Sequence, residues 1–160
     1  MREGADVADC LVCPRLRWAD PAPRDAIAER AGWRVSHAFG ANLPGWLVVV
    51  PTRHVTSLDE LTDGEAGALG GLLRAATSAL RAVTGCEKTY VLLLAEAEGF
   101  AHVHFHVVPR HAEMDPAARG AKVFALLHNP ELAVVDAATM DRLALAVRAH
   151  LLAAGAAELP

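Results

Sequence analysis

The sequence contains three histidines at alternate positions, His102, His104 and His106, separated by Val103 and Phe105. A β-strand directs residues i, i+2 and i+4 to one face and the intervening residues to the other. The pattern therefore predicts a strand with imidazoles on one face and apolar side chains on the other. Burying imidazoles without partners costs about 1–3 kcal/mol each, which favours metal binding or catalysis. The alternative is a half-exposed strand whose polar face is histidine.

A second candidate for chemistry is the cysteine pair Cys10 and Cys13. Zinc usually takes four thiolate and imidazole ligands, and a Cys-x-x-Cys pair supplies two of them. The remaining candidates are His54 and one histidine of the row. The competing interpretations are a redox pair, which would need a βαβ context that this order of elements lacks, or two independent buried thiols. Cys86 is interpreted as a structural thiol.

The histidine row also fits phosphoryl chemistry. A neutral imidazole attacks phosphorus when its other nitrogen is tied to a fixed acceptor and neighbouring donors meet the developing charge. The pattern favours phosphoryl or nucleotidyl transfer only mildly over a purely metal-binding face. A single ion held by all three histidines is disfavoured, because alternate strand residues lie about 7 Å apart. The other histidines lack partner spacing and are interpreted as structural: His37, His111, His128 and His150.

Size and composition predict one globular domain spanning residues 1–160. The chain has 160 residues, of which 53% are hydrophobic, enough for one core. Its net charge of −4 argues against a nucleic acid polymer as a partner. No apolar run reaches the roughly 18–20 residues of a membrane helix, and the N-terminus lacks the apolar segment of a signal peptide. With an odd number of cysteines, these features predict a cytoplasmic protein that does not bind membranes.

The elements that must position these residues can be read from the sequence periodicity. Strands are predicted at 33–39, 46–50, 89–94 and 102–108. A capping box at Thr62 and Glu65 opens a long amphipathic helix that ends at Gly85. Apolar residues at helical spacing predict a C-terminal helix around 140–151, whereas 14–30 reads as a loop with one helical turn and 114–135 has no assignment. This order predicts an antiparallel sheet in an α+β domain.

These motifs resemble the histidine triad (HIT) family, whose signature is His-φ-His-φ-His-φ-φ, matched here by His102-Val-His-Phe-His-Val-Val108. The segment 45–54 is similar to the family's Gly-x-Leu-Val-x-Pro-x-x-His with one residue more, and the Cys-x-x-Cys pair is frequent in the family. The resemblance covers roughly 10–110 and leaves 111–160 as an extension. It implies a HIT-like antiparallel sheet of about five strands, a long helix after the first hairpin, a C-terminal helix and helices on one side of the sheet.

The resemblance also implies an activity and a site. The family hydrolyses or transfers nucleotides at the α-phosphate, and its members often pair as homodimers. By analogy His104 is the nucleophile that forms a nucleotidyl-histidine intermediate with a small nucleotide, and His106 is a phosphate contact and orienting donor. A structural zinc would be held by Cys10, Cys13, His54 and His102, with no coordination position left open.

Several positions depart from the family pattern. Trp46 stands where the family commonly has a histidine that supports the row. The loop 95–101 carries two glutamates instead of the usual ribose- and phosphate-binding residues, and glutamates would repel a phosphate. This leaves Asn42 and Gly99 as candidate substrate contacts. The departures keep open an alternative function, a zinc-stabilised nucleotide-binding module with little or no turnover.

Overall fold

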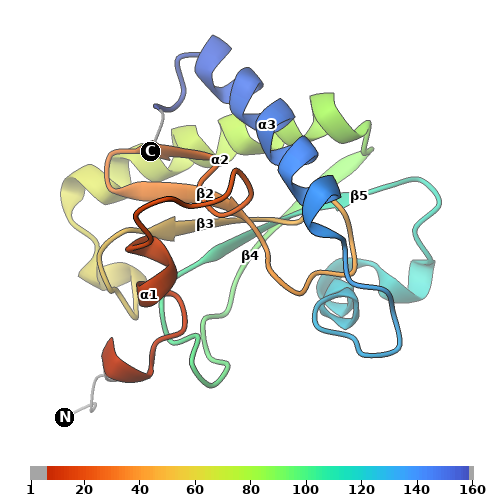
Figure 1. Cartoon of the computed structure of the whole chain (residues 1–160), viewed down its shortest axis with the longest axis horizontal. Helices are drawn as coiled ribbons and strands as arrows, with labels where there is room; N and C mark the ends of the chain where they lie inside the picture. The colour runs from red at the N-terminus through yellow and green to blue at the C-terminus, as the bar shows by residue number, and fades with distance from the viewer. Residues whose placement is uncertain (1–6, 159–160) are drawn as a thin grey trace.

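The structure is a computed structural model and describes residues 7–158. One antiparallel sheet with the strand order β1-β2-β3-β5-β4 forms its centre (Figure 1). The strands are β1 (Ala28–Arg30), β2 (Trp33–His37), β3 (Leu47–Pro51), β4 (Lys88–Leu93) and β5 (Phe105–Arg110). The α-helices are α1 (Cys13–Leu16), α2 (Asp63–Thr84) and α3 (Ala137–Ala153). Short 3-10 helices are η1 (Val7–Asp9), η2 (Leu58–Glu60), η3 (Pro116–Ala118) and η4 (Gly120–Leu126). No helix within 7–158 is both long and apolar enough to cross a membrane.

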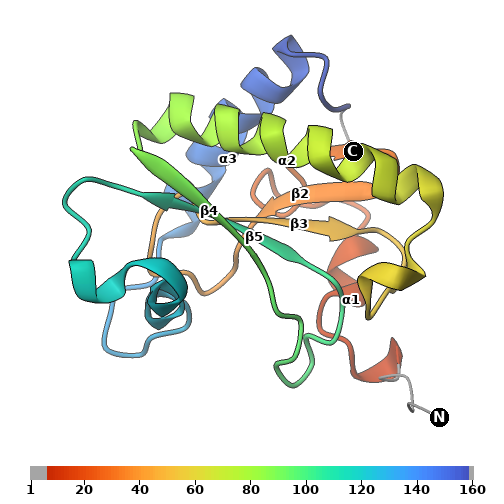
Figure 2. The same ribbon diagram turned by 180° about the vertical axis from the view of Figure 1, so that it is seen from behind.

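Helix α2 begins and ends where the sequence predicts. The Thr62 hydroxyl accepts a hydrogen bond from the Glu65 backbone N–H, and the Glu65 carboxylate accepts one from the Thr62 N–H, which completes the capping box. Gly85 ends the helix with a φ of 69°, a left-handed conformation that glycine adopts without strain. Figure 2 shows α2 lying across the sheet. Leu72 and Leu80 are buried in the core between them.

Helix α3 packs on the same face of the sheet as α2 and shares that core. Its buried residues Ala144, Val147 and Leu151 belong to the same cluster as the sheet residues. The Arg148 guanidinium donates hydrogen bonds to the Ile27 and Ala26 carbonyls at 2.7 and 2.6 Å. The C-terminal extension therefore completes the core formed by residues 10–110.

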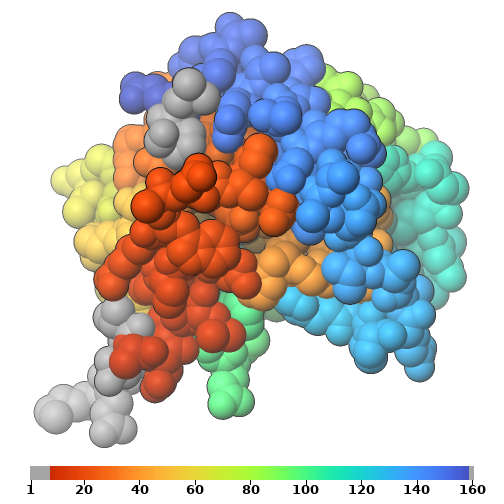
Figure 3. Space-filling model, viewed as in Figure 1, coloured from red at the N-terminus to blue at the C-terminus, as the bar shows by residue number. Residues whose placement is uncertain are grey.

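The opposite face of the sheet is covered by the N-terminal segment and by the segment between β5 and α3. The N-terminal segment with α1 packs on Val50, and the segment that contains η3 and η4 packs on Trp46 and Val108. Figure 3 shows the N-terminal segment, coloured red, and the C-terminal segment, coloured blue, on one side of the molecule. The N-terminal segment and the segment with η3 and η4 form the walls of the site.

The α+β class and the five-stranded antiparallel sheet are confirmed, with corrections to individual elements. The interpretation of 14–30 as a loop with one helical turn is wrong at 28–30, which form β1 and pair with β2. The strand predicted from His102 begins only at Phe105. The chain leaves the ladder there because the Val103 N–H donates to the Val55 carbonyl, at 2.7 Å, outside β3. Helices on one side are observed for α2 and α3, whereas α1 lies on the other face.

Candidate active site and metal centre

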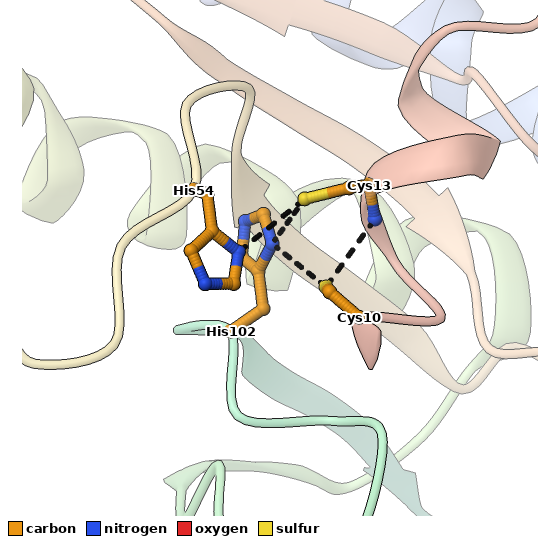
Figure 4. Close-up of side chains that lie close together, drawn as sticks. All are labelled: Cys10, Cys13, His54 and His102. Atoms are coloured by element: carbon orange, nitrogen blue, oxygen red, sulfur yellow. Dashed lines mark hydrogen bonds between the residues drawn. The ribbon is translucent and has the colours of Figure 1, made fainter. Parts of the chain in front are cut away.

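Four potential metal ligands from three separate segments meet at the end of the sheet where β3 ends and β5 begins (Figure 4). Two cysteines come from the turn that opens α1, one histidine follows β3 and one precedes β5. The Cys10 and Cys13 sulfurs each lie 3.6 Å from Nδ1 of His102. The Cys13 sulfur lies 3.3 Å from Nδ1 of His54. All four ligand atoms lie within 4.8 Å of one another.

A hydrogen bond orients the His102 ring, with Nδ1 toward the centre of this cluster. Nε2 of His102 is 2.9 Å from the Pro51 carbonyl, which can only accept, so Nε2 carries the proton and the Nδ1 lone pair faces the sulfurs. A carbonyl partner on the outer nitrogen is the usual arrangement around a metal-bound histidine. Nε2 of His54 is buried and has no hydrogen-bond partner among residues 7–158, so that ring's only polar contact is toward the cluster.

The donor set fits a tetrahedral zinc ion. Ligand bonds of 2.0–2.3 Å place neighbouring ligand atoms about 3.3–3.8 Å apart, in the range of the separations between the sulfurs and nitrogens here. Burial, together with the nearby Cys10, raises the pKa of the Cys13 thiol to about 11. A thiolate at this position therefore needs a compensating cation, which a divalent metal supplies.

The three histidines of the row do not share one environment. His102 lies in the ligand cluster, whereas His104 and His106 line a cavity of about 320 Å³. The His104 and His106 rings contact each other edge to face with centroids 4.7 Å apart. His102 lies beside His54 because the adjacent Val103 N–H donates to the Val55 carbonyl, at 2.7 Å, in the segment that follows β3.

His104 presents a nitrogen lone pair to the cavity. Its Nδ1 lies 2.7 Å from the His102 carbonyl and must donate to it, which leaves Nε2 unprotonated. Burial lowers the pKa of His104, so the ring is neutral at physiological pH. A neutral imidazole with one nitrogen anchored to a carbonyl is the arrangement required of a nucleophile.

His106 has the opposite proton arrangement. The Trp46 indole Nε1–H donates to Nδ1 of His106 at 3.0 Å, so Nε2 of His106 carries the proton. Burial, with contributions from His104 and His128, lowers the pKa of His106 to about 3. The two adjacent rings therefore offer a lone pair and an N–H donor to the same cavity.

The cavity walls are mainly apolar and aromatic. Phe39 stacks on Phe100 with ring centroids 5.6 Å apart, and the Arg15 guanidinium lies 4.0 Å from the Phe39 ring centroid. Arg15 is the sole lysine or arginine that lines the cavity within 7–158. The lining also includes two acidic side chains, Asp25 and Glu96. Further lining residues come from β2, β3, the loop before the triad and η4: His37, Val48, Leu94, Ala97, Phe124 and His128.

The two candidate substrate contacts lie outside the lining residues. The Asn42 side-chain amide donates to the Asn129, Leu132 and Ala133 carbonyls at 3.0–3.2 Å, and so holds the segment before α3. Gly99 adopts a φ of 76° and its carbonyl accepts from the Leu11 N–H at 2.8 Å, which joins the loop to the N-terminal segment.

Sequence reasoning missed several cavity residues. His128 was interpreted as structural, yet it lines the cavity with its ring 5.5 Å from that of Phe39. His128 follows η4 and itself adopts a left-handed conformation with a φ of 56°, so no periodic pattern in the sequence marks it. Arg15 had one available signal, its position two residues after Cys13. His37 matches the structural interpretation: Nδ1 donates to the Ala38 carbonyl and Nε2 accepts from the Gly45 N–H.

Comparisons with known proteins agree with this architecture. A family model described as HIT domain matches residues 21–113. A Hit-like protein involved in cell-cycle regulation from Bartonella henselae aligns with a TM-score of 0.71 at 16% identity, covering 93% of this chain and 100% of that chain. A Zn-bound histidine triad family protein from Mycobacterium smegmatis aligns with a TM-score of 0.66 at 19% identity, covering 91% of this chain and 96% of that chain.

A third solved structure is that of a uridylyltransferase mutant. It aligns with a TM-score of 0.65 at 24% identity and covers 92% of this chain but 48% of that chain. At these identities the three similarities show a shared fold. A search of curated protein sequences gives no match.

Proposed function

Because this chain belongs to the HIT domain family, we propose that it is a nucleotide phosphohydrolase or nucleotidyl transferase that acts at the α-phosphate of a small nucleotide. The observation that carries the proposal is the pair of neighbouring imidazoles with opposite proton positions on one cavity. A uridylyltransferase of similar fold supports group transfer as the reaction class.

In the proposed first step, Nε2 of His104 attacks the α-phosphorus. A P–N bond forms, the P–O bond to the leaving group breaks, and the electron pair departs on that oxygen. The ring becomes cationic, and its Nδ1–H stays hydrogen-bonded to the His102 carbonyl, which stabilises the charge. Water or an acceptor hydroxyl then attacks the same phosphorus and loses its proton to solvent, the P–N bond breaks, and its electron pair returns to Nε2 of His104.

Two further groups are proposed to meet the phosphate charge. Nε2–H of His106 donates to a phosphoryl oxygen, an interaction that strengthens as negative charge develops. The Arg15 guanidinium, stacked on Phe39, supplies a fixed positive charge in the cavity lining. The carboxylates of Asp25 and Glu96 in the same lining repel a polyanion. The positive charge of Arg15 is therefore needed to offset this repulsion.

Zinc is the metal ion that we propose for the cluster of Cys10, Cys13, His54 and His102. Bound there, it would join the turn that opens α1 to the segments on either side of the triad. Four protein ligands close the coordination shell, so the ion would have a structural role. The Zn-bound relative from Mycobacterium smegmatis supports this assignment.

The direct test replaces His104 with alanine and assays a panel of adenine and guanine dinucleotides and nucleoside phosphoramidates. We expect turnover to fall by at least about a thousandfold, because the nucleophile is removed. His150→Ala, an exposed histidine on α3, is the matched control and should keep parental activity. Equal turnover in His104→Ala and the parent protein would contradict the assignment.

A second candidate function is a zinc-stabilised nucleotide-binding module with little turnover. The two acidic side chains in the cavity lining favour it, because carboxylates oppose the additional negative charge that develops on the phosphoryl oxygens during the reaction. Calorimetric titration with nucleoside monophosphates, beside the activity panel, separates the two functions. Binding without turnover would support the module.

From the resemblance we also propose a cytoplasmic homodimer. β4 is an edge strand, and its Val91 is 43% exposed, which suits pairing with a second copy. Sedimentation equilibrium would report the mass directly, and a monomer at micromolar concentration would contradict the proposal.

A further inference from the structure

Trp46, where the sequence departs from the family pattern, contacts the catalytic row directly. Its side chain is fully buried, with 0% exposure, between Gly45 and the start of β3. The indole Nε1–H donates to Nδ1 of His106 at 3.0 Å, and the two rings meet edge to face at 85°. Among residues 7–158, this is the one hydrogen bond of the His106 ring, and the ring lines the cavity.

An indole N–H can donate a hydrogen bond but has no nitrogen lone pair with which to accept one. Nδ1 of His106 must therefore accept, and a proton placed on it would put two N–H groups against each other inside the core. A histidine at position 46 could reverse its role and accept from His106. Tryptophan cannot.

We propose that Trp46 is a positioning residue that fixes His106 in the Nε2–H form, so that His106 donates a hydrogen bond to the substrate but delivers no proton. If Nε2 gave up its proton while Nδ1 stayed unprotonated, an imidazolate anion would remain, which is inaccessible in a buried site. This inference rests on the proposed function and specifies its substrate class.

The leaving group then determines which nucleotides react. His104 has its one proton on the His102 carbonyl, and His106 keeps its own, so neither imidazole beside the phosphorus protonates the departing atom. A phosphoanhydride needs no proton, because the P–O electron pair leaves on a phosphate oxygen as a stable anion. A phosphoramidate leaves as an amine and requires protonation of its nitrogen. The site therefore favours phosphoanhydrides.

The proton position can be measured without any substrate. Long-range proton–nitrogen NMR correlations of the labelled full-length protein should show His106 with a protonated Nε2 and an unprotonated Nδ1 at neutral pH. Trp46→Phe keeps an aromatic ring but removes the donor, so His106 should populate both forms. A protonated Nδ1 in the parent protein, or an unchanged His106 in a folded Trp46→Phe variant, would overturn the role of Trp46.

Trp33→Phe is the matched control. Trp33 is also fully buried, and its indole N–H donates to the Glu65 carbonyl at 2.9 Å on the helix side of the sheet. Its replacement removes a buried indole hydrogen bond of the same kind but should leave the His106 spectrum unchanged. A change in Trp33→Phe equal to that in Trp46→Phe would show a general structural effect and contradict the proposal.

The substrate preference is tested with two substrates that share one nucleotidyl group, a nucleoside diphosphate and a nucleoside 5′-phosphoramidate. We expect kcat/KM to favour the anhydride by at least about tenfold in the parent protein and by less in Trp46→His, where position 46 can accept. A phosphoramidate hydrolysed as fast as the anhydride by the parent protein would overturn the preference. If neither substrate reacts, the proposed function and the preference both fail, while the NMR result still decides the role of Trp46.

Discussion

The role that we propose for each histidine follows from the partner of its ring nitrogens. A carbonyl on Nδ1 of His104 leaves a nucleophilic Nε2, whereas an indole donor on Nδ1 of His106 leaves an Nε2–H donor. In His37 both nitrogens are bonded to the backbone, so that ring has no capacity left for substrate. The alternation at 102–106 predicts that the row is functional. The division of roles depends on Trp46 and on carbonyls that spacing does not reveal.

Among the individual residues of the cavity, Arg15 should contribute to nucleotide binding. Arg15→Ala removes the fixed positive charge from the cavity lining, and we expect KM to rise about tenfold with a smaller change in kcat, since a charged hydrogen bond contributes about 1.5–3 kcal/mol. Steady-state kinetics with the best substrate of the panel measures both constants. Arg17→Ala, an exposed neighbour, is the control. A similar rise in KM for both variants would indicate general electrostatics and contradict a specific contact.

At the scale of elements, the N-terminus of α2 should make stability depend on pH. The Glu65 carboxylate accepts from Arg53 and from the Thr62 N–H, and these hydrogen bonds lower the pKa of Glu65 to about 2. The contribution is therefore fully present above the ordinary pKa of about 4.3. It is lost as the pH falls toward 2.

Glu65→Gln should lower the free energy of unfolding at neutral pH by about 1–2 kcal/mol. The difference from the parent protein should shrink as the pH falls below about 4, because the parent carboxylate then protonates. Urea denaturation at several pH values measures it. Asp63→Asn changes an exposed carboxylate in the same turn and serves as the control. A difference that does not change with pH would argue against this ion pair.

Loss of the metal should destabilise the N-terminal segment with α1, which the metal site joins to the sheet. Cys10→Ser removes one ligand, so we expect elemental analysis to find about one zinc per chain in the parent protein and far less in the variant. Hydrogen exchange of 10–18 should accelerate, while α2 keeps its protection. Cys86→Ala, a buried thiol outside the cluster, should retain the metal. Full zinc content in Cys10→Ser would contradict the ligand assignment.

Elements with a strong period could be predicted from the sequence, and the others could not. α2 carries a capping box and a glycine stop, and the runs at 47–50 and 105–108 are rich in β-branched and aromatic residues. By contrast, β1 is three residues long and reads Ala-Glu-Arg, and it forms because β2 offers an antiparallel partner. The segment with η3 and η4 is held by tertiary contacts such as that of Val123 with its neighbours in the core, and these leave no periodic pattern.

In the whole molecule, α3 of the C-terminal extension packs in the same core as the motif-bearing region. Leu151→Ala should lower the free energy of unfolding by about 2–4 kcal/mol, because Leu151 is 1% exposed in the main core. Leu152→Ala should change it by less than about 0.5 kcal/mol, since the Leu152 side chain is 38% exposed. Chemical denaturation of both variants gives the comparison. Equal losses would contradict the placement of α3.

If His104 carries the nucleotidyl group during turnover, mass spectrometry of the quenched reaction should detect the covalent intermediate. Protein mixed rapidly with a nucleoside phosphoanhydride and quenched should gain the mass of one nucleotidyl group, located by peptide mapping on His104. The His104→Ala variant should gain none. An adduct of the same mass in His104→Ala, or one located on another residue of the parent protein, would contradict the account.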